Sequence, residues 1–164
     1  MPNRQQKGMA RVINAIRWRL RRAVFLARSE WFRSPPFVMS YHGFNLEYEK
    51  GDVLVYLFSV TGQYEPQVIS YLKSNFSGGA SVIDIGANVG FFSLAVLALI
   101  PESTIHMFEP SPLPRGHLTN TINRNRLQTR AILHPFALFS EPGEMDFCVH
   151  AGHHSAFDGL RDTN

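Results

Sequence analysis

A short apolar segment that leads into a glycine-spaced turn constrains the fold of this chain more than any other feature. Residues 82–94 read VIDIGANVGFFSL, so an acid, Asp84, stands near the end of the segment, and glycines follow at positions 86 and 90. Short apolar strands of this kind are typical of parallel sheets. Gly86 allows the backbone to turn and a ligand to approach without a Cβ in the way. Gly90 is expected to permit close packing between the following helix and the strand.

The remainder of the chain after residue 80 alternates between strand and helix patterns. We expect strands at 81–85, 104–108 and 131–136, and helices at 90–100 and from 112 to about 125, with a further strand within 144–149. Pro101 ends the first helix, whereas Ser111 and Pro112 suit the N-cap and first position of the second. This alternation predicts an α/β fold with a doubly wound, Rossmann-like parallel sheet.

The segment ahead of this unit has its own pattern. Residues 44–48 and 53–58 are rich in strand-forming side chains and flank Lys50-Gly51-Asp52, which predicts a β-hairpin. Pro66 predicts the start of a helix that ends near Ser77-Gly78-Gly79. We therefore divide the chain into a basic segment (1–33), a lead-in hairpin and helix (34–79) and an α/β unit (80–164).

A net positive charge is confined to the first segment. Residues 1–33 carry nine Lys or Arg and one acid (+8), and residues 34–164 carry seven Lys or Arg and twelve acids (−5), which sum to the net charge of +3. This distribution argues against nucleic-acid binding by the α/β unit. The basic segment has the pattern of an amphipathic helix with Trp18 and Trp31 as interfacial anchors, so it is either a peripheral membrane contact or a helix that packs on its own domain. No run is apolar enough for a membrane span or a signal peptide, and we expect a cytoplasmic protein in which a peripheral membrane contact of the basic segment is one of these two alternatives.

Two acids at successive strand ends suggest a ligand. Glu109 follows the second strand, 25 residues after Asp84, where an acid can accept hydrogen bonds from ribose hydroxyls. Asn88 stands where a dinucleotide fingerprint requires glycine, which disfavours a pyrophosphate. An adenosine ligand with a charged tail, S-adenosylmethionine, fits this combination. The alternative is that Asp84 caps the turn and Glu109 is a surface acid.

The sequence also resembles a known family. VIDIGANVGFFSL, IHMFEPSP, LTNTINRN, HPFAL and PGEMDF are similar to the FkbM family of S-adenosylmethionine-dependent methyltransferases, over about residues 60–150, and Tyr64-Glu65-Pro66 is similar to the lead-in of that family. The resemblance implies a class I methyltransferase fold and O-methylation of a hydroxyl on a sugar, glycan or secondary metabolite. It also implies a set of cofactor-binding residues, namely Asp84, Gly86, Asn88 and Gly90 in the first loop, Glu109 at the ribose, and Pro110, Ser111 and Ala137 near the adenine. Leu138 and Phe139 precede Ser140 and Glu141, so the contact to the adenine amino group stays open.

The resemblance raises a question of extent. The family's sheet has seven strands, whereas this sequence predicts three of them and one extra strand. Val82, Ile83 and Ile85 would then border an open apolar edge, which suggests a truncated chain or a partner chain that supplies the missing strands. A cofactor-binding module without turnover of its own is therefore the alternative to an active enzyme.

Catalytic and metal-binding groups are not assigned from the sequence. Three histidines cluster late in the chain, namely His150, His153 and His154. They could be solvated loop side chains, an acid–base group or metal ligands, and the sequence leaves these alternatives open. Cys148 is the single cysteine, so the sequence excludes an internal disulfide and a cysteine-based zinc site.

Overall fold

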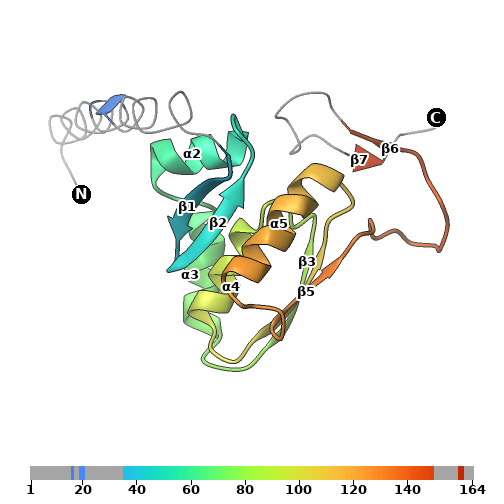
Figure 1. Ribbon diagram of the computed structural model, residues 1–164. Helices are drawn as coiled ribbons and strands as arrows, with labels where there is room; N and C mark the ends of the chain where they lie inside the picture. Colours follow the sequence, from blue (N-terminus) through green and yellow to red (C-terminus); the bar gives the residue numbers. More distant parts are fainter. Residues whose placement is uncertain (1–15, 17–18, 21–34, 150–158, 161–164) are drawn as a thin grey trace, which may run out of the picture.

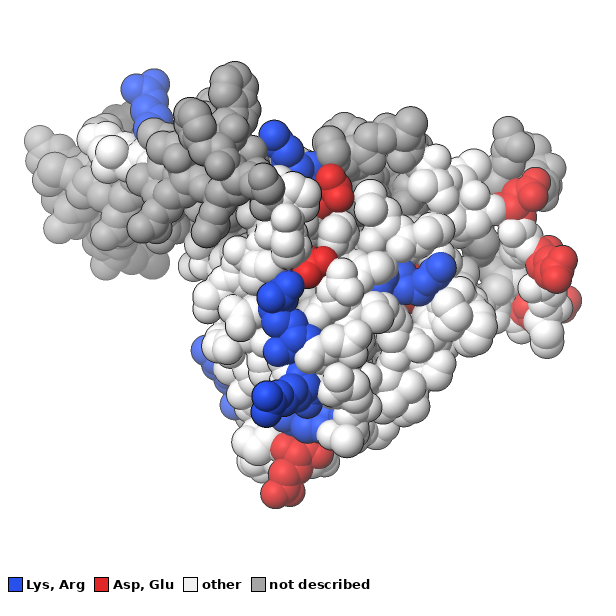
Figure 2. Space-filling view, in the orientation of Figure 1, with Lys and Arg blue, Asp and Glu red and all other residues white. Residues whose placement is uncertain are grey.

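The computed structural model describes residue 16, residues 19–20, 35–149 and 159–160 (Figure 1). Ile16, Arg19 and Leu20 are helical, and the rest of the predicted basic helix lies outside the described residues, as do the predictions for membrane contact. Among the described helices, none combines the length and the apolar character that a membrane crossing requires. Figure 2 shows Lys and Arg side chains interspersed with acidic ones over the described part of one face.

The hairpin forms earlier in the chain than the sequence pattern predicts. Strand β1 (Phe37–Tyr41) pairs antiparallel with β2 (Phe44–Tyr48), in a register that opposes Tyr41 and Phe44. The two residues between the strands, His42 and Gly43, have positive φ angles of 48° and 86°. Two-residue turns with both φ angles positive match the twist of the flanking strands. The prediction that residues 53–58 form the second strand of the hairpin is wrong.

Those residues form helix α2 (Val53–Thr61) instead. The Oδ1 atom of Asp52 accepts hydrogen bonds from the backbone N–H groups of Leu54 (2.8 Å) and Val55 (3.0 Å), which satisfies donors at the helix start. Gly62 ends the helix in the left-handed conformation, with φ of 71°. These two caps outweigh the strand propensity of the Val-rich segment.

Helix α3 (Pro66–Asn75) begins at Pro66 as predicted and leads to the main sheet. Strands β3 (Ser81–Ile85), β4 (Thr104–Phe108) and β5 (Ala131–His134) lie side by side in the order β3-β4-β5, all parallel. The bounds of β3 and β4 agree with the prediction, and β5 ends two residues earlier than predicted, ahead of Pro135. The predicted α/β class with a Rossmann-like parallel sheet is confirmed.

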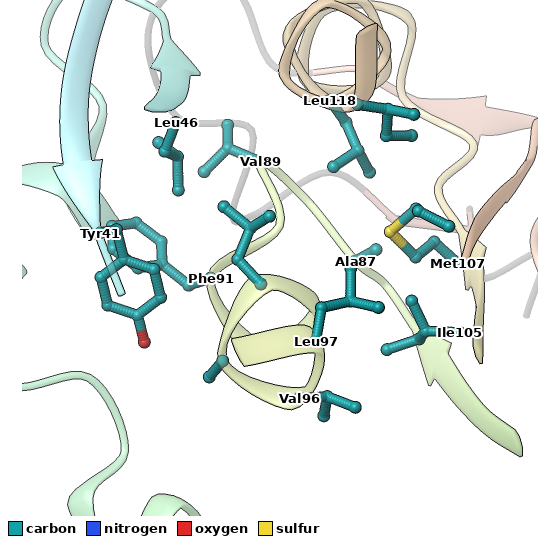
Figure 3. Close-up of a cluster of buried hydrophobic side chains, with 14 of the residues drawn as sticks. Tyr41, Leu46, Ala87, Val89, Phe91, Val96, Leu97, Ile105, Met107 and Leu118 are labelled. Atoms are coloured by element: carbon teal, nitrogen blue, oxygen red, sulfur yellow. The ribbon is translucent and has the colours of Figure 1, made fainter. Parts of the chain in front are cut away.

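The two crossover helices cover one face of this sheet. Helix α4 (Phe91–Leu99) connects β3 to β4, and α5 (Pro112–Arg124) connects β4 to β5 (Figure 1). Figure 3 shows side chains of α4 and its preceding loop packed between the hairpin, α5 and the sheet. Most of α4 is buried, as its uniformly apolar sequence predicts. The described core thus has three layers, with the hairpin outside the helices and the sheet on their other side.

The opposite face of the sheet is exposed in the described part of the chain. Ile83 and Ile85 on β3 are 62% and 67% exposed, whereas Val82 on the same strand packs against the core. β3 has β4 as its partner in the described sheet, and its other edge is open. The predicted strand within 144–149 is confined to β6 (Phe147–Cys148), which pairs with β7 (Gly159–Leu160) in a separate two-stranded sheet.

Candidate functional site

The loop between β3 and α4 has an unusual backbone. Gly86, Asn88 and Gly90 all have positive φ angles, of 77°, 49° and 97°. The N–H groups of Gly86 and Ala87 donate hydrogen bonds of 2.9 and 3.1 Å to the carbonyl oxygen of Phe108, at the end of β4. These bonds hold the loop against the end of the neighbouring strand. A Cβ on Gly86 would meet no atom within 4 Å, so this glycine leaves open space beside the loop.

The conformation of Asn88 explains its presence in the turn. Asparagine is among the residues that tolerate the left-handed region best. Its Oδ1 accepts a hydrogen bond from the N–H of Val89 (2.8 Å), and its own N–H donates to Oε2 of Glu109 (2.7 Å). Asn88 therefore joins the first loop to the acid at the end of β4.

Glu109 lies at the centre of the arrangement and is 4% exposed. Its Oε2 accepts from Asn88, and its Oε1 accepts a hydrogen bond from the N–H of Ser111 (2.8 Å). The alternative that Glu109 is a surface acid is therefore wrong. Each carboxylate oxygen has a second acceptor position, so Glu109 can accept further hydrogen bonds while its orientation stays fixed by the backbone of both loops.

Asp84 is also buried, and its environment differs from that of Glu109. Its Oδ2 accepts a hydrogen bond from Oγ of Ser93 on α4 (2.5 Å), and its Oδ1 has no donor among the described residues. Burial raises the pKa of Asp84 above its ordinary value, and the nearby carboxylates of Glu109 and Glu65 raise that pKa further, against the Ser93 hydrogen bond. A buried carboxylate oxygen without a donor can bind a cationic or hydrogen-bond-donating ligand.

Gly90 packs differently from the sequence expectation. A Cβ at this position would lie 2.7 Å from Cδ1 of Leu118, which belongs to α5 and not to a strand. The predicted role in helix–strand packing is therefore corrected to close contact between the loop and α5. Both this contact and the positive φ angle require glycine.

The remaining predicted site residues, Pro110, Ser111 and Ala137, are divided between the loop and a cavity. Pro110 and Ala137 line a cavity of about 460 Å³ beyond the ends of β4 and β5, with mainly apolar walls that include Phe136 and with Glu141 at its lining. Ser111 is not among the lining residues and contributes its N–H to Glu109. The structure thus brings Pro110, Ala137 and Glu141 together, although residues 138–140 separate the last two in sequence.

Sequence reasoning missed two residues that fix this site. Ser93 is the one polar residue of FFSLAVLAL, and a lone hydroxyl in an otherwise apolar helix was the available signal. Arg115 donates hydrogen bonds from Nη1 to the carbonyl oxygens of Pro110 (2.6 Å) and Glu109 (3.4 Å), and no pattern in the sequence indicates this contact. Together they fix Asp84 and the second loop.

The described residues contain no group of three or more His, Cys, Asp and Glu side chains placed to hold a metal ion. His150, His153 and His154, for which loop, acid–base and metal roles were open, lie outside the described residues.

Part of the chain is similar in sequence to a methyltransferase. The chain is 40% identical over 52 residues to the 31-O-demethyl-FK506 methyltransferase FkbM of Streptomyces tacrolimicus, a match that covers 32% of this chain and 20% of that protein. The chain thus matches about a fifth of the length of this curated relative. No family model matches the chain.

Solved structures with a similar chain path include two proteins called TYW2. The P. horikoshii protein in complex with MeSAdo has a TM-score of 0.47 and 15% identity, over 72% of this chain and 43% of that one. The M. jannaschii protein in complex with AdoMet has a TM-score of 0.44 and 13% identity, over 66% and 47%.

Proposed function

We propose that this chain acts in S-adenosylmethionine-dependent methylation, as a relative of the FkbM family, and that the acceptor is a hydroxyl on a sugar, glycan or secondary metabolite. The observation that carries the proposal is the position of Glu109, whose two oxygens are each held by a backbone N–H of a different loop. The 52-residue similarity to an O-demethyl-FK506 methyltransferase supports the same chemistry.

The residues present fit the cofactor's polar groups. The second acceptor positions of the Glu109 oxygens suit the two ribose hydroxyls. The Oδ1 of Asp84, buried and without a donor among the described residues, suits an ammonium or N–H group of the amino acid part. The open space beside Gly86 allows the ligand to approach the backbone of the loop.

The cavity beside Pro110 and Ala137 fits the adenine ring. Its walls are mainly apolar, as expected for a slot that holds a planar base. Glu141 lies at the same cavity, so its carboxylate can accept a hydrogen bond from the adenine amino group. With this proposal, Glu141 is the residue that contacts the adenine amino group, a contact for which the sequence resemblance names no residue.

When bound, S-adenosylmethionine supplies an electrophilic methyl group for attack by an acceptor oxygen. The described residues contribute by positioning: Glu109 and Asp84 fix the two ends of the ligand, and Gly86 and Asn88 shape the loop between them. Because Oδ2 of Asp84 is held by Ser93, the carboxylate is oriented before any ligand binds. No catalytic base is assigned among these residues.

We also propose that a further polypeptide segment, supplied by a partner chain or in cis, pairs with β3. The open edge of β3 and the exposed Ile83 and Ile85 support this proposal, because parallel sheets are normally covered on both faces. A cytoplasmic location, with residues 1–33 in contact with anionic lipid, is likewise a proposal that rests on the charge of the first segment.

A methyl-transfer assay tests the proposed function. The purified full chain is incubated with S-adenosylmethionine and a panel of hydroxylated sugars, glycans and polyketides, and the formation of S-adenosylhomocysteine is measured. We expect turnover that Asp84→Ala abolishes and that a distant acid variant, Glu102→Ala, retains. Cofactor binding without turnover on any acceptor would identify a binding module instead of an active enzyme.

A further inference from the structure

A second cavity lies between the tip of the β1–β2 hairpin and α3. Its volume is about 350 Å³, which is within the range of small-ligand pockets. Its lining comes from the end of β1 and the following turn, from the end of α2, and from the first two turns of α3. None of its lining residues belongs to the set assigned to the cofactor above.

Aromatic rings form one wall of this cavity. Tyr41 contacts Phe58 edge to face, with ring centroids 5.1 Å apart, and Tyr64 stacks on Phe91 at 4.9 Å. Phe91 also contacts Tyr41 edge to face at 4.9 Å, and Figure 3 shows these two rings side by side. Because each lining ring packs against another ring, the wall is pre-organised for an apolar group.

The lining of the cavity also contains polar side chains and one cation. Lys73 is the one Lys or Arg of the lining, which contains no Asp or Glu, and it has no carboxylate partner among the described residues. His42 lies on the hairpin turn. Its pKa is lowered first by burial and then by the nearby charge of Lys73. Within the described part of the chain, Lys73 is therefore a cation without an acidic partner in the lining of a partly aromatic cavity.

Glu65 lies at the start of α3, between the lining residues Tyr64 and Pro66, whereas Lys73 lies in a later turn of the same helix. Burial, then Tyr64 and then the charge of Glu65 raise the pKa of Tyr41 to about 12. Burial, then the charges of Glu65 and Asp84, raise the pKa of Tyr64 to about 12. An anionic group would be repelled from the Tyr64 end and attracted to Lys73. The distribution of charge thus gives a bound ligand a defined direction.

We propose that this cavity binds a small organic anion with an aromatic or branched apolar body. The anionic group pairs with Lys73, and the body packs against Tyr41, Phe58 and Ile69. The inference does not rest on the proposed methyl transfer, because the cavity and the cofactor loop have separate residues and either assignment can fail alone.

Fluorine NMR with a matched pair of probes tests this inference. The full chain is titrated with 3-(4-fluorophenyl)propanoate and with the corresponding neutral amide, and binding is followed by the shift and width of the ¹⁹F signal. We expect the propanoate to bind about five- to tenfold more tightly than the amide, as one charge-assisted contact permits. Equal affinity for the two probes, or no binding of either at millimolar concentration, would overturn the inference.

Four variants assign the effect to this cavity. Lys73→Gln should reduce the affinity for the propanoate to that for the amide, Lys73→Arg should preserve the preference, and Lys50→Gln, which removes the same charge outside the lining, should change nothing. Ser70→Trp, on the exposed side of α3, should fill the cavity and abolish binding of both probes. Thermal unfolding confirms that each variant is folded, and unchanged binding by folded Lys73→Gln or Ser70→Trp would refute the assignment.

Discussion

Replacement of Glu47 by glutamine should destabilise the chain by weakening the contacts between the hairpin and α5. Glu47 on β2 is 4% exposed and faces α5. Its Oε1 accepts a hydrogen bond from Nδ2 of Asn120 (2.6 Å) and lies 3.3 Å from Nδ1 of His117, and its Oε2 pairs with Nη2 of Arg124 (3.1 Å). Its backbone N–H donates to Oγ1 of Thr121 (2.9 Å), which a side-chain replacement leaves in place.

The magnitude follows from these contacts. Hydrogen bonds to a charged group contribute about 1.5–3 kcal/mol each when they are buried. The Arg124 side chain is 40% exposed, so solvent screening reduces its share to at most about 1 kcal/mol. Glutamine keeps one acceptor oxygen. We therefore expect Glu47→Gln to lower the free energy of unfolding by about 2–3 kcal/mol, or the midpoint by roughly 5–10 °C.

The effect should depend on pH in a defined direction. Although burial opposes the charged form of Glu47, hydrogen bonds from Asn120, Arg124 and His117 lower its pKa overall below the ordinary value of 4.5. A carboxyl group whose folded pKa is lowered stabilises the fold above its unfolded pKa and loses that contribution as the pH falls through the folded value. The difference between wild type and Glu47→Gln should therefore be full at pH 7 and shrink in acid.

Urea unfolding followed by circular dichroism measures both quantities. Glu49→Gln is the matched control, because Oε2 of Glu49 lies 3.2 Å from Nε2 of the same His117 but the Glu49 side chain is 32% exposed. We expect the control to lose less than about 1 kcal/mol. If Glu47→Gln lost no more than Glu49→Gln, or if its effect grew in acid, the assignment of Glu47 as the link between hairpin and helix would be refuted.

Three further predictions follow from the loop and the sheet. Gly90→Ala should destabilise the chain by about 2–4 kcal/mol, because the new side chain meets both a positive φ angle and a close contact with Leu118. Adding Leu118→Ala to this variant should relieve the clash but not the backbone strain. Equal stability of wild type and Gly90→Ala in calorimetry would contradict this. Asp84→Asn should raise the stability of the unliganded chain at pH 7 and abolish cofactor binding. Burial raises the pKa of the Asp84 carboxyl, which means that its charged form costs stability in the folded chain as the pH rises through that pKa, and asparagine removes this charge. Stability of this variant equal to or below wild type would count against that sign. Ile85→Lys should reduce self-association in analytical ultracentrifugation without a change in unfolding midpoint, since Ile85 is 67% exposed, and a wild-type chain that stays monomeric at all concentrations would contradict the role of this face.

The elements that the sequence predicted well are those with local stop signals. Gly90, Pro101 and the Ser111-Pro112 pair define the ends of α4 and the start of α5, so these helices agree with prediction within a few residues. The hairpin was placed wrongly because the turn His42-Gly43 is not among the strong hairpin dipeptides. The capping role of Asp52 was equally hidden, because it depends on side-chain geometry.

The candidate site shows the same division. Asp84 and Glu109 could be singled out because each follows an apolar strand at a characteristic spacing. Their hydrogen-bond partners could not, since the contacts of Glu109 to Asn88 and of Asp84 to Ser93 join separate elements. Glu141 became a candidate through its place at the cavity beside Ala137, which depends on the path of the loop after β5.

Calorimetric titration with S-adenosylhomocysteine tests the central claim, that Glu109 holds the ribose of an adenosine cofactor, most directly. The full chain and Glu109→Gln are each titrated with this ligand and with its 2′-deoxyribose analogue, and Ala137→Trp serves as a separate block of the adenine cavity. The account predicts that Glu109→Gln weakens binding of S-adenosylhomocysteine by about 5- to 150-fold, that the deoxy analogue loses much less, and that Ala137→Trp binds neither. Equal affinity of wild type and Glu109→Gln for S-adenosylhomocysteine, or the same loss for both ligands, would contradict it.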